Sequence, residues 1–99
     1  MQAQKTTSPM NLFVIDDHPL MREAVVMLLR RLRPGANVVE LERMGGLDAA
    51  VRQHGAPDLI CLDLKLPDTT GTSGVHEIKN LFPGTPLAVL SASPASDAE

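Results

Sequence analysis

Aromatic residues and cysteine are scarce in this sequence. Tryptophan and tyrosine are absent, and aromatic residues make up only 2% of the 99 residues. The platforms on which single-stranded nucleic acids stack are therefore excluded. The one cysteine, Cys61, cannot form an internal disulfide, so the sequence fits a reducing compartment and we expect a cytoplasmic protein.

A net positive charge and long apolar runs are also missing. The formal net charge is −3 at pH 7, which gives no basic footprint for binding a nucleic-acid backbone. The apolar runs are too short to span a bilayer, and the N-terminal residues lack the apolar stretch of a secretory signal, so no membrane partner is expected. With 43% hydrophobic and 21% charged residues, the composition is that of a globular protein. We interpret residues 1–10 as a flexible lead-in and residues 11–99 as one small domain.

Segments of strand character alternate with segments of helical spacing along the chain. Strands are predicted at residues 11–16, 37–42, 58–64 and 86–91. Helices are predicted from Pro19 to the break at residues 34–35, over residues 47–54, and around residues 75–82. Strands that alternate with helices indicate crossover connections and a parallel sheet, so the predicted fold class is α/β.

Carboxylates follow or interrupt two of the predicted strands. Asp16 and Asp17 close the first strand, and Asp63 lies inside the nearly all-apolar third strand. Ser91 ends the fourth strand. Because all strands of a parallel sheet end at one edge, where ligands bind in open α/β sheets, we expect these side chains to converge.

Converging carboxylates need a positive partner. Two of them roughly 4 Å apart repel by about 1 to 4 kcal/mol, depending on the effective dielectric constant. Mg²⁺ prefers oxygen ligands and neutralises charge during phosphoryl transfer. An aspartate can itself accept a phosphoryl group as an acyl phosphate, and Ser91 could donate a hydrogen bond to a phosphoryl oxygen.

Each of these residues also has a purely structural interpretation. Asp17 or His18 could cap the first helix, and Ser91 could be a turn residue. Cys61 is interpreted as a core residue. Asp63 is the exception, because burying a charge inside an apolar strand is costly and nothing in the strand requires it.

Three sequence segments resemble one known family. The run FVIDDHPLMREAVVMLLRRL resembles the first strand and helix of bacterial two-component response regulator receiver domains, and DDHPL is similar to the subgroup with LuxR-type (NarL/FixJ) output domains. The run PDLICLDLKLPDTTG resembles the segment around the family's phosphoacceptor, and PLAVLSAS resembles its fourth strand. The resemblance extends over residues 11–93.

The resemblance implies a flavodoxin-like, doubly wound parallel sheet with strand order 2-1-3-4. It places the phosphoacceptor at Asp63 and the family's hydroxyl residue at Ser91. It also implies Mg²⁺ bound by Asp16 or Asp17, by Asp63 and by the backbone carbonyl of Lys65. The phosphoryl donor would be a phosphohistidine of a sensor kinase or phosphotransfer protein, or a small acyl phosphate. DNA would be reached only through an output domain that this sequence does not contain. Beyond the receiver's own phosphorylation and dephosphorylation, no enzymatic activity is expected.

The sequence departs from the family pattern at its C-terminal end. Receivers continue with a helix, a strand that supplies a lysine, and a last helix, and we expect these to be missing here. None of Lys5, Lys65 and Lys79 takes that lysine's place. Ser96 and Glu99 have capping-box spacing, which fits either a beginning helix or a polar tail. An open fourth strand and an uncovered first helix predict a homodimer or a strand-exchanged oligomer.

Three other functions would each require a different feature of the sequence. A truncated interaction module that is not phosphorylated would suit a chain that lacks the final elements. A haloacid-dehalogenase-type phosphatase would need a second aspartate two residues after Asp63, where Lys65 stands. A flavin-binding flavodoxin would need a Ser, Thr and Gly-rich loop after the first strand, whereas Asp16 and Asp17 would repel phosphate.

Overall fold

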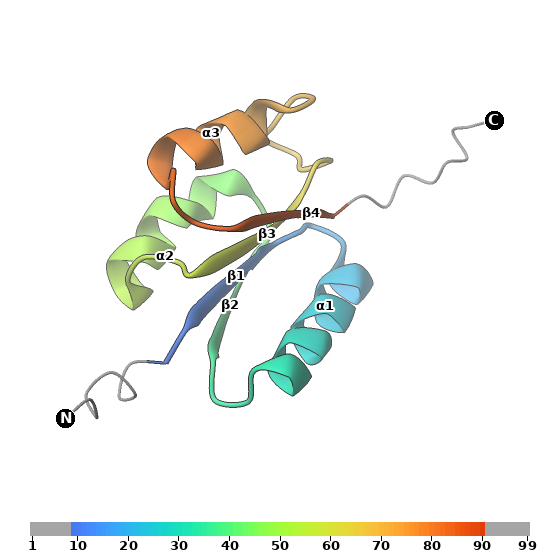
Figure 1. Ribbon diagram of the computed structural model, residues 1–99. Helices are drawn as coiled ribbons and strands as arrows, with labels where there is room; N and C mark the ends of the chain where they lie inside the picture. The colour runs from blue at the N-terminus through green and yellow to red at the C-terminus, as the bar shows by residue number, and fades with distance from the viewer. Residues whose placement is uncertain (1–8, 91–99) are drawn as a thin grey trace.

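The structure is a computed structural model that describes residues 9–90. Ser91 and the pair Ser96 and Glu99 lie outside the described residues. Four strands form one parallel sheet: β1 (Asn11–Ile15), β2 (Asn37–Leu41), β3 (Leu59–Asp63) and β4 (Leu87–Leu90). The helices are α1 (Pro19–Leu32), α2 (Leu47–His54), α3 (Ser73–Leu81) and a 3-10 turn, η2 (Met44–Gly46). The strand order is β2-β1-β3-β4, which confirms the predicted α/β topology (Figure 1).

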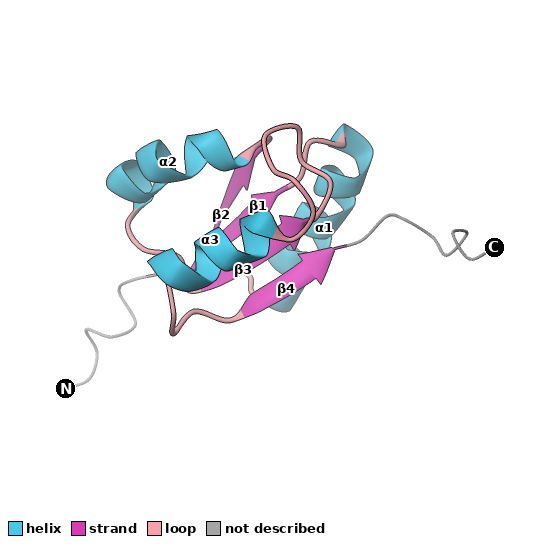
Figure 2. Ribbon diagram, turned by 90° about the horizontal axis from the view of Figure 1, so that it is seen from above, coloured by secondary structure: helices cyan, strands magenta, loops and turns pink. Residues whose placement is uncertain are grey.

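Helices cover both faces of the sheet. Helix α1 lies on one face, and α2 and α3 lie on the other (Figures 1 and 2). Successive side chains of a strand point to opposite faces, so Phe13 and Ile15 join the core under α2 and α3, while Leu12 and Val14 join the core under α1. Apart from Asn11 at the start of β1 and Asp63 at the end of β3, the central strands are apolar, because both of their faces are buried.

The register of the strands aligns their C-terminal ends. Ile15 of β1 pairs with Leu62 of β3, so the residues that follow each of them, Asp16 and Asp63, lie at neighbouring positions on the same edge. The amide of Asp16 also donates a hydrogen bond of 2.9 Å to the carbonyl of Leu41 in β2. This register brings the two aspartates together although they are far apart in sequence.

Glycine ends two of the helices as predicted. Gly35 follows α1 with φ 95°, and Gly55 follows α2 with φ 97°. A side chain at either position would be strained, because L-residues with a Cβ rarely adopt positive φ. The breaks between the predicted elements therefore fall where the sequence places them.

Apolar side chains remain exposed on α1 and on β4. Leu20 is 80% exposed, Leu32 is 63% exposed, and Val89 on the edge strand β4 is 47% exposed. This agrees with the expectation that the first helix is uncovered and the fourth strand is an open edge. Within residues 9–90 we find no helix with the length and apolar character needed to cross a membrane.

Candidate functional site

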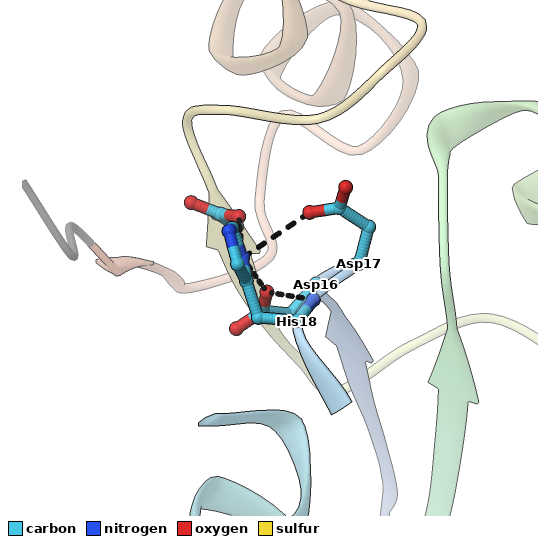
Figure 3. Close-up of side chains that lie close together, drawn as sticks. Asp16, Asp17 and His18 are labelled. Atoms are coloured by element: carbon cyan, nitrogen blue, oxygen red, sulfur yellow. Dashed lines mark hydrogen bonds and ion pairs between the residues drawn. The ribbon is translucent and has the colours of Figure 1, made fainter. Parts of the chain in front are cut away.

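Three aspartates and one histidine meet at the C-terminal edge of the sheet. One ligand atom each from Asp16, Asp17, His18 and Asp63 lies within 4.8 Å of the others. The predicted convergence of the three carboxylates is therefore confirmed. Figure 3 shows His18 beside Asp16 and Asp17 in the loop that follows β1.

Two of these carboxylates are buried almost completely. Asp16 is 0% exposed and Asp63 is 2% exposed. Oδ2 of Asp16, Oδ1 of Asp17 and Oδ2 of Asp63 are all buried without a hydrogen-bond partner. Buried anionic oxygens of this kind are costly unless a cation or a donor satisfies them.

The ring of His18 lies at the centre of the acidic cluster. Its Nδ1 is 2.9 Å from Oδ1 of Asp16, 3.2 Å from Oδ1 of Asp17 and 3.2 Å from Oδ2 of Asp63. A carboxylate only accepts, so Nδ1 must carry the hydrogen, and one hydrogen can serve only one of the three oxygens. The hydrogen bond to Asp16 raises the pKa of His18; desolvation opposes that shift, and the charge of Asp17 adds to it.

Sequence reasoning missed this position of His18. It offered Asp17 or His18 as a helix cap, but the side chain of His18, at the N-cap of α1, makes no capping hydrogen bond. Its backbone amide instead donates to Oδ1 of Asp16 at 2.9 Å. The available signal was the direct adjacency of the histidine to two carboxylates at a strand end.

Asp63 is held by the chain that follows it. Its Oδ1 accepts a hydrogen bond of 3.1 Å from the backbone amide of Lys65. Burial raises the pKa of Asp63, the Lys65 amide lowers it, and the charge of Asp16 raises it further. The carbonyl of Lys65 as a metal ligand stays a prediction, and Ser91 lies outside the described residues.

Arg22 supports the site from α1, which sequence reasoning did not foresee. Its guanidinium donates to the backbone carbonyl of Asp16 at 2.8 Å and, through Nε, to Oε1 of Glu40 in β2 at 3.1 Å. The arginine thereby joins the loop after β1 to the neighbouring strand. This contact fixes the backbone from which Asp16 and Asp17 project.

The donor set fits a hard divalent cation. All three carboxylates offer oxygen ligands, and each has a buried oxygen with no hydrogen bond. Mg²⁺ and similar ions prefer such oxygens and are commonly bound by one or two carboxylates together with phosphate oxygens. The arrangement is therefore chemically suited to bind a cation and to present Asp63 beside it.

Comparisons with known proteins show which family this chain resembles. The family model of the response regulator receiver domain matches residues 12–99. The glycerol metabolism activator of Pseudomonas putida is 35% identical over 81 residues, which are 82% of this chain and 37% of that protein. The chain thus spans little more than a third of the length of that relative.

Two solved structures have the same fold. A LuxR-family two-component response regulator from Aurantimonas sp. SI85-9A1 matches with a TM-score of 0.69 and 28% identity, over 92% of this chain and 64% of that one. The phosphorylated cyanobacterial phytochrome response regulator RcpA matches with a TM-score of 0.72 and 29% identity, over 90% of this chain and 69% of that one. By sequence and by fold, this chain belongs to the response regulator receiver domain family.

Proposed function

We propose that this chain accepts a phosphoryl group on Asp63 from a phosphohistidine of a sensor kinase or phosphotransfer protein, with Mg²⁺ bound beside it. The observation that carries the proposal is the buried carboxylate of Asp63, whose Oδ2 has no hydrogen bond and lies in an acidic cluster. The phosphorylated relative RcpA supports the same chemistry.

The residues around Asp63 have separate roles in this proposal. Asp16 and Asp17, together with Asp63 and the backbone carbonyl of Lys65, would hold Mg²⁺. When bound, the ion supplies positive charge that offsets the negative charge on the transferring oxygens. Ser91 is proposed to donate a hydrogen bond to a phosphoryl oxygen. Arg22 fixes the loop after β1 by its bond to the carbonyl of Asp16.

The transfer is a displacement at phosphorus. A carboxylate oxygen of Asp63 forms the new bond to phosphorus as the bond from phosphorus to the donor's imidazole nitrogen breaks, and that nitrogen keeps the electron pair. The amide of Lys65 holds Oδ1 of Asp63 and so orients the carboxylate. Water later attacks the acyl phosphate and restores the carboxylate, with release of inorganic phosphate.

Mass spectrometry of the intact protein tests the proposal. After incubation with Mg²⁺ and acetyl phosphate, we expect a phosphate-sized mass increase that disappears in Asp63→Asn. Asp58→Asn is the matched control, because Asp58 accepts a hydrogen bond from Asn11 at the other end of the sheet and should leave phosphorylation intact. No mass increase, either in this chain or in a version extended to the full length of its relatives, would overturn the proposal.

This chain spans 37% of the length of its Pseudomonas putida relative, so the proposal extends to the partners that a chain of that length would have. We infer that phosphorylation controls an output domain outside this sequence, and that DNA is contacted only by that domain. A relative from Mycobacterium tuberculosis, the probable transcriptional regulatory protein TcrX, is 34% identical over 87 residues and supports a transcriptional output.

A second candidate function is a phosphorylation-independent interaction module that forms a homodimer or a strand-exchanged oligomer. The exposed apolar residues on α1 and β4 favour it, because contiguous exposed apolar surface marks sites of association. This function requires that binding is unchanged by Asp63→Ala, whereas the phosphoacceptor function requires that substitution to abolish phosphorylation. The two functions are therefore separable by one variant.

A further inference from the structure

The loop that follows β3 is tied to a distant turn by one carboxylate. Asp68, in the loop of residues 64–72, accepts a hydrogen bond of 3.0 Å from the amide of Met44 on Oδ1 and one of 2.8 Å from the amide of Gly45 on Oδ2. Both donors belong to η2, the turn that leads from β2 into α2. The connecting loops on this side of the sheet are seen in Figure 2.

The two amides need this partner. Met44 and Gly45 are the first residues of a helical turn, where backbone N–H groups have no acceptor within the helix. A carboxylate that accepts two such N–H groups makes charge-assisted hydrogen bonds, which are stronger than neutral ones. Met44 itself is 6% exposed and packs in the larger core, so the turn is fixed relative to the sheet.

Asp68 therefore anchors one end of the short segment that begins at Asp63. Lys65, two residues after Asp63, donates its amide to Oδ1 of that carboxylate at 3.1 Å. Leu66 is 5% exposed and packs in the core. Asp68 then fixes the chain to η2, so the segment is held at both ends and at its middle.

We propose that Asp68 is a positioning residue that holds the backbone of Lys65 in place beside Asp63 and so maintains the affinity of the acidic site for Mg²⁺. The inference rests on the proposed function, because it assumes that the carbonyl of Lys65 is a ligand of that ion. Asp68 acts through the loop and does not touch the acidic cluster: both of its oxygens are occupied by the amides of η2.

Magnesium affinity, measured separately from stability, tests the role of Asp68. The dissociation constant of Mg²⁺ is measured by calorimetry or amide NMR at a temperature where each variant is folded. Loss of a group that orients a metal ligand typically weakens binding by about tenfold or more, and we expect about that for Asp68→Ala. Asp68→Asn should fall between wild type and alanine, because its single amide oxygen replaces only one of two acceptors. The amide resonances of Lys65 and Leu66 should also shift in Asp68→Ala.

Asp58→Ala is the matched control. Asp58 also accepts a backbone N–H, that of Asn11 at 2.8 Å, but it precedes β3 at the opposite end of the sheet. It should lower thermal stability while leaving the Mg²⁺ dissociation constant unchanged. An equal change in both alanine variants, or no change in Asp68→Ala when wild type binds Mg²⁺ and is phosphorylated, overturns the inference and leaves the proposed function standing. A wild-type chain that neither binds Mg²⁺ nor is phosphorylated overturns both. Asp68→Asn supplies the comparison if the alanine variant does not fold.

Discussion

His18 covers the carboxylate of Asp63. Nδ1 of the ring is 3.2 Å from Oδ2 of Asp63, and only 2% of Asp63 is exposed, whereas half of the His18 side chain is exposed. Because the carboxylate is buried and the ring beside it is half exposed, we expect a phosphoryl donor that approaches from solvent to meet the ring first. The ring also lies between the oxygens that a divalent cation would bind, so it must move when either one enters.

Removing this ring should open the site. We expect His18→Ala to lower the Mg²⁺ dissociation constant severalfold, because the ring no longer competes with the cation for the carboxylate oxygens. We also expect faster phosphorylation by acetyl phosphate, because the ring no longer blocks access to Asp63. Calorimetry and the time course of the intact mass measure the two effects. His76→Ala, an exposed position on α3, is the control and should change neither. Weaker Mg²⁺ binding in His18→Ala would mean that the ring assists the cation.

Neutralising Asp63 should stabilise the chain when Mg²⁺ is removed. The side chain is buried beside Asp16, and burial and that neighbouring charge both raise its pKa. Asp63→Asn keeps the acceptor for the Lys65 amide and removes the charge beside Asp16, which relieves about 1 to 4 kcal/mol of repulsion, depending on the effective dielectric constant. Urea unfolding in the presence of a chelator should show this gain, and added Mg²⁺ should then stabilise wild type more than the variant. A variant less stable than wild type under chelation would contradict the account of the acidic cluster.

The hydrogen bond from Arg22 to Asp16 should contribute more to the free energy of unfolding than the ion pair of Arg22 with Glu40. The Arg22 side chain is 15% exposed and donates to the backbone carbonyl of the buried residue Asp16, whereas the side chain of Glu40 is 43% exposed. We expect Arg22→Ala to reduce the free energy of unfolding by about 1 to 3 kcal/mol, because the carbonyl of Asp16 loses a charged donor. Glu40→Gln should cost less than about 1 kcal/mol, the usual range for an exposed ion pair. Urea titrations compare them, and equal losses would assign the effect of Arg22 to the ion pair.

Cys61 should report on opening of the core. It is 4% exposed, and burial raises the pKa of its thiol above the ordinary value of 9.0. Burial disfavours the thiolate in the folded chain. The contribution of this thiol to the free energy of unfolding is therefore present below the ordinary thiol pKa, and it declines as the pH rises through the raised pKa of the folded chain. At pH 8 we expect a thiol reagent to modify native protein far more slowly than protein in concentrated urea. A reaction as fast in the native protein would mean that the face under α1 opens freely.

Self-association should depend on the open edge of the sheet. Light scattering is expected to show a dimer or a larger species, and Val89→Lys should shift it towards the monomer, because a charge on an edge strand discourages pairing with another edge. Leu81→Lys is the control, since Leu81 is also exposed (54%) but belongs to helix α3 and not to the edge strand of the sheet. A monomeric wild type with ordinary thermal stability would count against the predicted oligomer.

The fold could be predicted from the order of the segments, because each helix, strand and break is indicated by residues that are close together in the sequence. The apolar runs, the helical spacing and the breaks at Gly35 and Gly55 each depend on a few neighbouring residues, and the described elements lie within one or two residues of the predicted ones. The convergence of Asp16 and Asp63 was also predictable, since parallel strands end at one edge.

The contacts of individual side chains were decided only by the tertiary structure. The sequence alone determined a parallel α/β fold with a carboxylate embedded in its third strand, because hydrophobic periodicity and a charge in an apolar run are visible without coordinates. The receiver family was indicated by the resemblance of three sequence segments. The contact of His18 with Asp63 joins residues far apart in the chain, and so do the hydrogen bonds that Asp68 accepts from the amides of Met44 and Gly45. They depend on strand register and on rotamers chosen by packing, which no local pattern records.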